Sequence, residues 1–276
     1  MSDHVEEDPP HEPDHDPKPG RQAQAGSEPT SMTAPPGLRR ARLRRLALVA
    51  IVVVAGLTVL VVTAGGGSSP PKPDSAKALT TEHTISSLLA GIPQSANTLG
   101  QSTAPVTLEW YGDLECPYCK EFALGALPFI IQRWVRGGQL KIEYLSMETA
   151  TRDRKVFQTQ QVAALAAGQQ NKMWNFIETF YHEQGEEDSG YVTEQYLHGL
   201  ASQIPGLDLT LWSEDRYDPE LATQVTAERS AARHARFRVT PTFLIGHSNG
   251  PLYRLRPRSL TGRGPYFEAI EYLVGT

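Results

Sequence analysis

The sequence predicts an α/β fold with an inserted helical domain, preceded by one transmembrane helix and a disordered N-terminal tail. Three observations support this prediction. A strand–helix–strand pattern covers residues 106–145, a helical pattern without strand-like alternation fills residues 152–236, and the strand pattern returns at residues 239–246. A strand–helix–strand unit implies a right-handed crossover between two parallel strands, which is the beginning of an α/β sheet.

The N-terminal tail, residues 1–45, is predicted to be disordered and cytoplasmic. Its first 30 residues hold eight acidic residues, many prolines and no aromatic residue. Such a segment cannot bury enough apolar surface to offset the entropy that is lost on ordering. We interpret its histidines, His4, His11 and His15, as solvated, because a bound metal ion would have to order the tail by itself.

A transmembrane helix is predicted over residues 46–64, nineteen residues without a charge that follow five arginines in residues 39–45. At about 1.5 Å per residue it spans about 28 Å, close to the roughly 30 Å hydrocarbon core of a bilayer. The positive-inside rule then places the tail in the cytoplasm and the rest of the chain outside. A cleaved signal peptide ending at Val62-Thr63-Ala64 is the alternative, although the apolar run and the region before it are longer than usual.

A linker at residues 65–79 leads into the domain predicted for residues 80–276. The linker begins GGGSSPPKP, a mixture of glycine and serine flexibility with proline stiffness that is typical of a tether. Apolar spacing and strand-like alternation then predict the first part of the domain. Its expected elements are a short helix around 85–89, a strand at 106–111, a helix at 117–136 that kinks at Pro128 and ends at Gly137-Gly138, and a strand at 140–145.

The helical domain at residues 152–236 is expected to interrupt the sheet. Helical spacing of Ala, Gln and Leu, and then of Met and aromatic residues, indicates helices that pack in the core. Thr193 suits an N-cap and Pro219 suits the first residue of a helix. The expected elements are helices at 156–168, 173–184, 193–203 and 219–236, then a strand at 239–246, an Asn-Gly hairpin turn at 247–250, a return strand at 252–255 and a helix at 265–273.

Cys116 and Cys119 are the only cysteines in the chain, and they lie where the first strand passes into its helix. A disulfide between them closes too small a ring to brace distant parts of the chain, so it suits a reversible switch. Cys116 would lie at the helix N-terminus, where free N–H groups and the helix dipole favour a thiolate. Cys119 would be more buried and less acidic. We therefore expect Cys116 to exchange with a partner's sulfur and Cys119 to resolve the mixed disulfide.

Two structural alternatives exist for this pair. A zinc site would need a second CxxC or a His pair at ligand spacing, which the sequence does not offer, and the small ring disfavours a purely structural disulfide. Glu115 would oppose the thiolate if its charge were close, but we expect it to be solvated. The histidines of the domain are expected at surface or packing positions: His83, His182, His198, His234 and His247.

The composition limits the classes of ligand. The net charge of −5 is mild, and beyond residue 65 we identify neither a Gly-rich phosphate loop nor a basic stripe interleaved with aromatic residues. Nucleic-acid binding is therefore not predicted. No metal, nucleotide or flavin cofactor is expected.

The segment from residue 99 to residue 122, LGQSTAPVTLEWYGDLECPYCKEF, resembles the entry strand and active-site helix of a known family. This family is the DsbA-like thioredoxin-fold thiol-disulfide oxidoreductases, in particular their membrane-tethered, BdbD-like branch. There a helical domain interrupts the thioredoxin fold after its second strand, and the chain re-enters the fold at a threonine or valine followed by a cis-proline. Residues 152–236 and Thr240-Pro241 stand in these places, and the resemblance covers about residues 80–273.

The resemblance implies roles for individual residues. Cys116 is similar to the family's nucleophile and Cys119 to its resolving cysteine, with Pro117 and Tyr118 between them. Pro241 is similar to the cis-proline beside the disulfide. Thr240 matches the residue whose backbone pairs with an incoming substrate strand.

The sequence thus predicts a single-pass, extracytoplasmic thiol-disulfide oxidoreductase. We expect it to donate disulfides to cysteine-containing secreted or surface proteins and to be reoxidised by a quinone-linked membrane partner. A disulfide reductase or isomerase of the same fold is one alternative. A non-catalytic binding or chaperone module is another.

Overall fold

The computed structural model describes residues 75–276. The predicted tail, the predicted transmembrane helix and most of the predicted linker fall in residues 1–74, outside the described residues. Within residues 75–276, no helix is both long enough and apolar enough to cross a bilayer.

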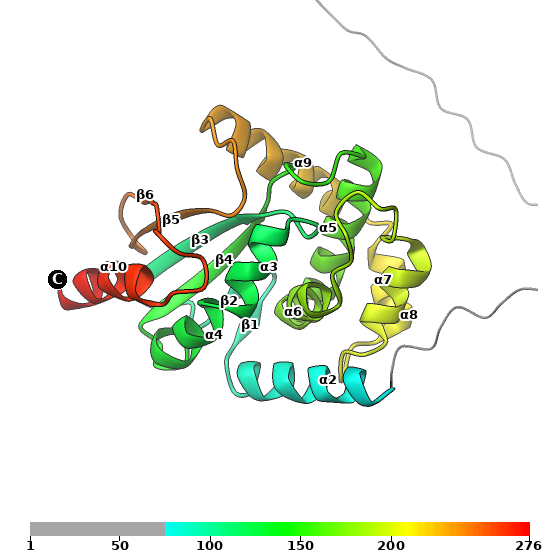
Figure 1. Ribbon diagram of the computed structural model, residues 1–276, viewed down its shortest axis with the longest axis horizontal. Coiled ribbons are helices and arrows are strands. Elements are labelled where there is room, and N and C mark those ends of the chain that lie inside the picture. The colour runs from blue at the N-terminus through cyan, green and yellow to red at the C-terminus, as the bar shows by residue number, and fades with distance from the viewer. Residues whose placement is uncertain (1–74) are drawn as a thin grey trace, which may run out of the picture. The chain divides into compact units, whose positions relative to one another are not determined.

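A six-stranded mixed sheet forms the centre of the described part of the chain, with strand order β1-β2-β4-β3-β5-β6 (Figure 1). The parallel pairing of β3 with β4, which aligns Val106 with Leu140, confirms the predicted crossover. The next strand along the chain, β5, pairs antiparallel with β3 on its other side. The strands are β1 (Gln94–Ser95), β2 (Thr98–Leu99), β3 (Val106–Gly112), β4 (Leu140–Ser146), β5 (Thr242–His247) and β6 (Tyr253–Leu255).

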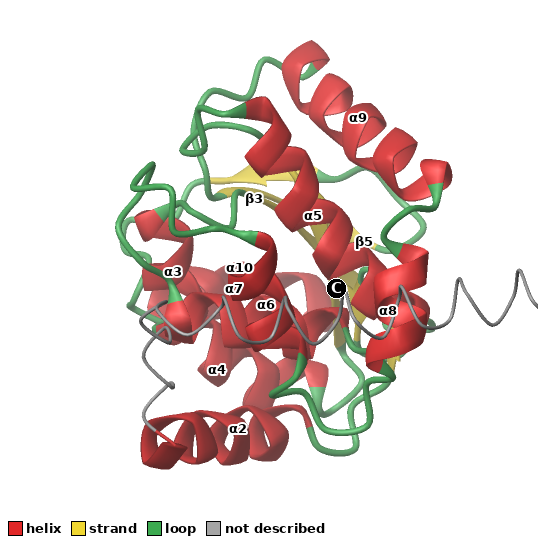
Figure 2. Cartoon of the chain, turned by 90° about the vertical axis from the view of Figure 1, so that its right-hand side faces the viewer, coloured by secondary structure: helices red, strands yellow, loops and turns green. Residues whose placement is uncertain are grey.

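The predicted helical insertion is confirmed, because five helices, α5 to α9, separate β4 from β5. Within it, α5 and α9 lie side by side (Figure 2). Thr193 caps its helix through the N–H of Tyr196, and Pro219 is the first residue of α9, both as predicted. The helices are α2 (Ser75–Leu89), α3 (Pro117–Leu124), α4 (Leu127–Ile130), the π-helical turn η1 (Ile131–Val135), α5 (Arg154–Gln169), α6 (Met173–Glu183), α7 (Glu194–Ala201), α8 (Leu209–Asp215), α9 (Pro219–His234) and α10 (Gly264–Gly275).

The structure differs locally from the prediction. The single helix predicted at residues 117–136 is broken after Leu124, rather than only kinked at Pro128. At the break, a Cβ on Gly125 would lie 2.7 Å from Cα of Thr261. Because glycine has no Cβ, the backbone at Thr261 can pack closely against this position. The short helix predicted around residues 85–89 is the end of the longer α2, and the two-residue strands β1 and β2 were too short for periodicity to indicate.

Trp110, fully buried on β3, joins the sheet to the helical insertion. Its ring centroid lies 4.9 Å from that of Phe122 on α3 and 5.1 Å from that of Tyr144 on β4. On the insertion side it stacks on Tyr181 at 5.6 Å and approaches Trp174 at 6.2 Å. Aromatic pairs at these separations add to the stability gained from burial alone. The aromatic residues predicted at helical spacing in residues 173–184 therefore serve the core.

Glu178 on α6 is a buried carboxyl group in this otherwise apolar region. The residue is 1% exposed, and its Oε1 has no hydrogen-bond partner among the described residues. Burial in a medium that disfavours charge raises the pKa of Glu178 to about 8. The folded chain therefore holds a proton here that the unfolded chain releases at much lower pH, so stability falls as the pH rises from about 4.5 to about 8.

Replacing this carboxyl group should flatten the pH dependence of stability. In the parent, we expect this group to lower the free energy of unfolding by roughly 3 kcal/mol between about pH 5 and about pH 8. Glu178→Gln should not show this decrease. Urea unfolding of the full chain across this range measures the effect. Glu271→Gln, which changes an exposed carboxyl on α10, is the matched control and should keep the parent's slope. A Glu178→Gln chain with that same slope would contradict the assignment.

Candidate active site

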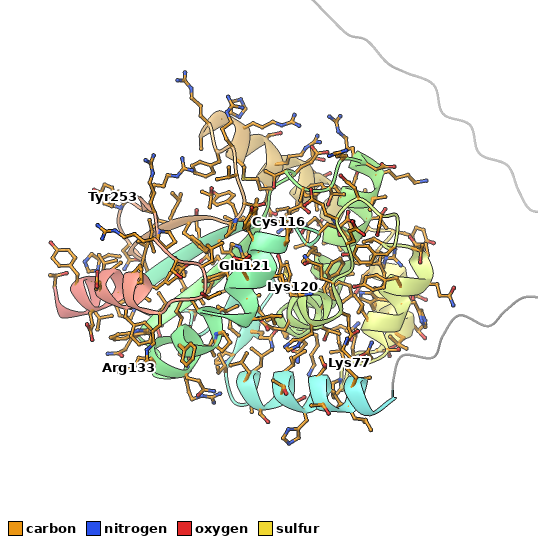
Figure 3. All side chains as sticks on the ribbon, in the orientation of Figure 1. Lys77, Cys116, Lys120, Glu121, Arg133 and Tyr253 are labelled. Carbon is orange, nitrogen blue, oxygen red and sulfur yellow. The ribbon has the colours of Figure 1, made fainter. Side chains whose placement is uncertain are left out.

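Cys116 is the N-cap of α3, with extended backbone angles, and Pro117 occupies the first helical position as predicted. Both Cys116 and Cys119 are free thiols. Figure 3 shows Cys116 at the start of α3, with Lys120 and Glu121 on the next turn. The sulfur of Cys116 donates a hydrogen bond to the backbone carbonyl of Thr240, at 3.4 Å. The sequence-predicted cysteine and the predicted substrate-binding loop are therefore in direct contact.

Hydrogen bonds to its sulfur lower the pKa of Cys116 to about 7, and the largest contribution comes from the Cys119 thiol. The Thr240 side chain and the backbone N–H groups of Cys119 and Tyr118 act in the same direction, while burial of the sulfur opposes them. About half of the Cys116 population is therefore thiolate near pH 7, compared with a small fraction for an ordinary cysteine. The predicted helix-terminal N–H groups contribute to this effect, but the neighbouring thiol contributes more.

Cys119 is fully buried one turn into α3. Burial is the main reason that its pKa is raised, and the hydrogen bond and charge of the Cys116 sulfur add to the shift. The two sulfurs therefore differ in the direction that the sequence predicts: the outer one is acidic and the inner one stays protonated.

The Thr240-Pro241 peptide bond is cis, the configuration that the resemblance implies. It precedes β5, so the sheet holds this loop opposite the start of α3. The side-chain hydroxyl of Thr240 is hydrogen-bonded to that of Thr149, in the loop after β4. The loop facing Cys116 is therefore tied to a third segment of the chain.

Asp113, fully buried in the turn between β3 and α3, organises these loops. Its Oδ2 accepts the backbone N–H groups of three successive residues, 149–151, at 2.9–3.0 Å. Its Oδ1 accepts the Thr151 hydroxyl at 2.6 Å and the Glu115 N–H at 3.2 Å. Because an ionised carboxylate only accepts hydrogen bonds, these donors suit the charged form. One anion thus fixes the turn before Cys116 against the loop that holds Thr240.

The end of α6 and the residue after it also bind the active-site turn. The Gln184 side-chain amide donates to the backbone carbonyls of Leu114 and Cys116, at 2.7 Å and 3.1 Å. The Tyr181 hydroxyl donates to the backbone carbonyl of Asp113 at 3.3 Å. The helical insertion therefore positions the cysteine pair directly as well as completing the core.

The prediction that Glu115 is solvated was wrong. The residue is 2% exposed, and burial raises the pKa of its carboxyl group. Tyr118, in contrast, is 58% exposed, so it offers an aromatic surface beside Cys116.

The histidines predicted at surface or packing positions are exposed in four cases, at His83, His198, His234 and His247, and partly buried in one, at His182. Among residues 75–276, no cluster of His, Cys, Asp and Glu is placed to hold a metal ion.

Sequence reasoning missed three features of the site. Neither Asp113 nor Thr149 was singled out from the sequence. The cluster of arginines in residues 229–263 was also not recognised from the sequence. A buried carboxylate whose donors are backbone N–H groups leaves no side-chain pattern, whereas the run of arginines without acidic residues was visible in the sequence.

Comparisons with known proteins agree with this geometry. A family model described as thioredoxin matches residues 94–250. Bacillus anthracis probable disulfide bond formation protein D is 21% identical over 154 residues, or 53% of this chain and 68% of the relative. Bacillus subtilis disulfide bond formation protein D is 24% identical over 152 residues, or 53% and 66%. The crystal structure of oxidised BdbD from Bacillus subtilis covers 67% of this chain and 97% of its own, with a TM-score of 0.56 and 21% identity.

A thioredoxin-like sheet with an acidic and a buried cysteine at the start of its first crossover helix defines a thiol-disulfide oxidoreductase. The structure and the matched relatives agree on this class. The chain belongs to the thioredoxin family.

The dominance of the Cys119 thiol over the pKa of Cys116 can be tested with two substitutions. Cys119→Ala removes the hydrogen bond and should raise the pKa of Cys116 towards that of an ordinary cysteine. Cys119→Ser keeps a donor and should hold the pKa closer to about 7. The pH dependence of iodoacetamide alkylation, followed by mass spectrometry, reports the midpoint. Equal midpoints in the two variants would contradict the assignment.

The role of Asp113 can be tested with an amide. In Asp113→Asn, either orientation of the side chain turns an NH₂ group towards N–H or O–H donors, so buried donors lose their acceptor. We expect a loss of about 3 kcal/mol in the free energy of unfolding, measured in urea. Asp188→Asn is the matched control, since the Asp188 carboxylate accepts from the exposed Arg152 side chain and its N–H at the surface, and it should cost less than about 1 kcal/mol. Equal losses would refute the special role of Asp113.

Proposed function

We propose that this chain is an extracytoplasmic oxidase that donates disulfides to cysteine-containing secreted or surface proteins, with Cys116 as its reactive sulfur. The observation that carries the proposal is the asymmetric pair itself. The pKa of Cys116 is lowered to about 7 where its sulfur meets the Thr240 carbonyl, while Cys119 is enclosed with a raised pKa. The names of the Bacillus relatives, disulfide bond formation protein D, support the oxidising direction.

The reaction begins with the Cys116–Cys119 disulfide and a substrate with two thiols. A substrate thiolate attacks the Cys116 sulfur, the bond to Cys119 breaks, and Cys119 leaves and takes a proton. The second substrate thiolate then attacks the substrate sulfur of the mixed disulfide, and Cys116 leaves as a thiolate. Two electrons pass to the chain, and the substrate releases two protons. A leaving group with a pKa of about 7 suits the last step.

Thr240 and Pro241 form the surface on which the substrate backbone lies in this proposal. The Thr240 carbonyl is at hydrogen-bond distance from the Cys116 sulfur, so a strand paired with Thr240 would bring its own cysteine against Cys116. Tyr118, which is exposed two residues after Cys116, offers an apolar contact.

The location in this proposal depends on residues outside the described range. The uncharged run at residues 46–64 and the arginines before it support a single membrane span with the catalytic domain outside the cytoplasm. The reduced pair would pass its two electrons to a quinone-linked membrane partner, which regenerates the disulfide. No resident cofactor is needed for the exchange itself.

A reductase or isomerase is the second candidate, because the lowered pKa of Cys116 serves thiol-disulfide exchange in either direction. A pKa of about 7 stabilises the reduced pair at pH 7 by only about 0.4 kcal/mol relative to an ordinary thiol, or about 10 mV. The thiolate alone therefore does not make the pair strongly oxidising. A reduction potential above about −200 mV would support the oxidase, and a value near about −270 mV would support the reductase.

The catalytic assignment can be tested on the full chain with a reduced peptide that carries two cysteines. The oxidised parent should convert the peptide to its disulfide, and Cys116→Ala should lose this activity. Reduced Cys119→Ala, mixed with two one-cysteine peptides that are joined by a disulfide, should accumulate a covalent complex with one of them. Neither the inner thiol nor a second thiol on the bound peptide is then present to release it. The same potential measurement on the parent, by equilibration with glutathione, assigns the direction. Full activity in Cys116→Ala would refute the mechanism.

A further inference from the structure

Residues 229–263 carry eight arginines and neither Asp nor Glu, in a chain whose net charge is −5. This stretch runs from the end of α9 through the cis-proline loop and β5 to the segment after β6. Arginine keeps its charge at every physiological pH and binds carboxylates in a two-pronged geometry. The local excess of positive charge therefore surrounds the loop that faces Cys116.

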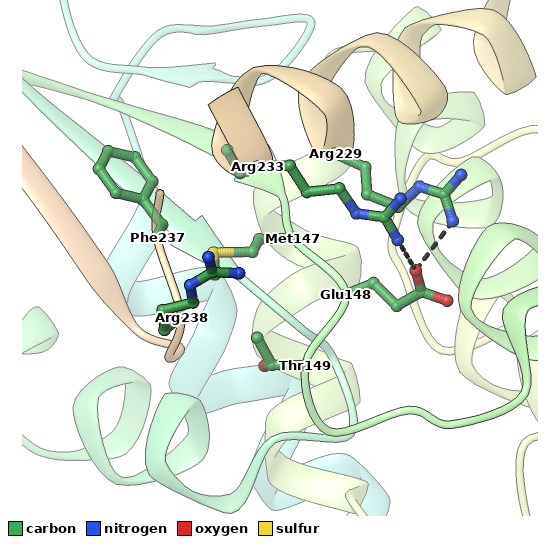
Figure 4. Close-up of a pocket in the computed structure, with 8 residues that line it drawn as sticks. Met147, Glu148, Thr149, Arg229, Arg233, Phe237 and Arg238 are labelled. Carbon is green, nitrogen blue, oxygen red and sulfur yellow. Dashed lines mark hydrogen bonds and ion pairs between the residues drawn. The ribbon is translucent and has the colours of Figure 1, made fainter. Parts of the chain in front are cut away.

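A cleft of about 220 Å³ next to this loop contains part of that excess. Figure 4 shows Arg229 and Arg233 converging on Glu148, with ion pairs of 2.8 Å and 3.2 Å. Arg238 lies in the same cleft without an ion pair among the described residues (Figure 4). The cleft is thus lined by one carboxylate and three guanidinium groups, which leaves it with a surplus of positive charge.

The cleft adjoins the proposed substrate surface. Thr149 lines the cleft and is hydrogen-bonded to Thr240, whose carbonyl contacts the Cys116 sulfur. Arg238 lies two residues before Thr240, and the exposed Arg236 lies four residues before it. Because neighbouring residues of an extended strand are about 3.3 Å apart, side chains that flank a substrate cysteine would reach these arginines.

The opposite edge of the same loop is also positively charged. The Arg254 guanidinium lies over the Phe237 ring, 5.3 Å from its centroid, and also donates to the Thr242 hydroxyl at 3.5 Å. Phe243 pairs with Leu255 in the antiparallel register of β5 and β6. The chain after Leu255, which begins with the exposed Arg256, therefore continues towards Thr242 and the cis-proline loop.

We propose that these arginines select substrates, so that the preferred partner of Cys116 is an extended polypeptide segment with acidic residues beside its cysteine. This inference deepens the proposed function and rests on it. The carboxylates of such a segment would meet Arg238 in the cleft and the exposed Arg236 two residues before it, while the backbone of the segment lies on Thr240. Charges at the edge of a binding surface mainly raise the association rate and fix the partner's orientation.

The test compares three peptides, each with two cysteines, that differ only in whether Glu, Gln or Lys flanks the first cysteine. The oxidised full chain is reconstituted in phosphatidylcholine vesicles, and the initial rate of its reduction by each peptide is followed. The informative quantity is the ratio of the rate with the Glu peptide to the rate with the Gln peptide, because it cancels any common change in reactivity. This ratio should fall as salt is added.

The test variant combines Arg236→Gln with Arg238→Gln. The side chains of both residues lack hydrogen bonds and ion pairs within the described part of the chain, so the fold does not depend on them. The matched control combines Lys77→Gln with Arg133→Gln, which removes the same charge from positions that Figure 3 shows away from Cys116. We expect the Glu-to-Gln ratio to fall about tenfold in the test variant and to stay at the parent's value in the control.

Three other outcomes would overturn the inference. A parent that oxidises all three peptides, with the same Glu-to-Gln ratio as the test variant, overturns the acidic preference alone. A parent that reacts with none of them overturns the proposed function as well. If the arginines bind anionic lipid instead, adding phosphatidylglycerol in equal amount will slow the reaction of the Gln peptide with the parent but not with the test variant. The Glu-to-Gln ratio will then be the same in both chains.

Discussion

The buried carboxylate of Asp113 is the interaction on which the arrangement of the site depends. It binds the turn before Cys116 to the backbone of residues 149–151, and Thr149 in turn binds Thr240. Three segments that are distant in the sequence therefore take their relative positions from one anion and its donors. Charged hydrogen bonds in a dry interior are strong and directional. This explains how loops, rather than regular elements, can hold a sulfur within contact of a backbone carbonyl.

Much of the fold could be predicted because it follows from local periodicity. Residues that are close in the sequence determine several of its features: the alternation in β4, the turn after β5 and the apolar faces of α5 and α6. The acidity order of Cys116 and Cys119 follows from their places on one helical turn. The break after Leu124 could not be predicted in this way, because Thr261 packs against Gly125 from a distant part of the chain. The burial of Glu115 was missed for a similar reason, since it depends on how the loops fold over the turn.

The helical insertion is part of the redox site in a physical sense. Trp110 stacks on Tyr181 within one continuous core, and Tyr181 and Gln184 donate hydrogen bonds to the backbone of residues 113–116. Changes in the packing of α6 would therefore alter the position of the turn that carries Cys116. Glu178, whose Oε1 has no hydrogen-bond partner among residues 75–276, lies on this same helix, so a destabilising group is placed on the element that supports the thiol pair.

In the proposed mechanism, the enclosure of Cys119 affects how long a mixed disulfide on Cys116 lasts. In a mixed disulfide, Cys119 can attack Cys116 and return the partner unchanged, or the partner's second thiol can complete the oxidation. A fully buried thiol with a raised pKa is rarely a thiolate, so the unproductive return is slow. The covalent complex then persists long enough for a flexible chain to bring its second cysteine into place. The fold thus favours partners whose second cysteine reaches the mixed disulfide while the partner is still covalently bound to Cys116.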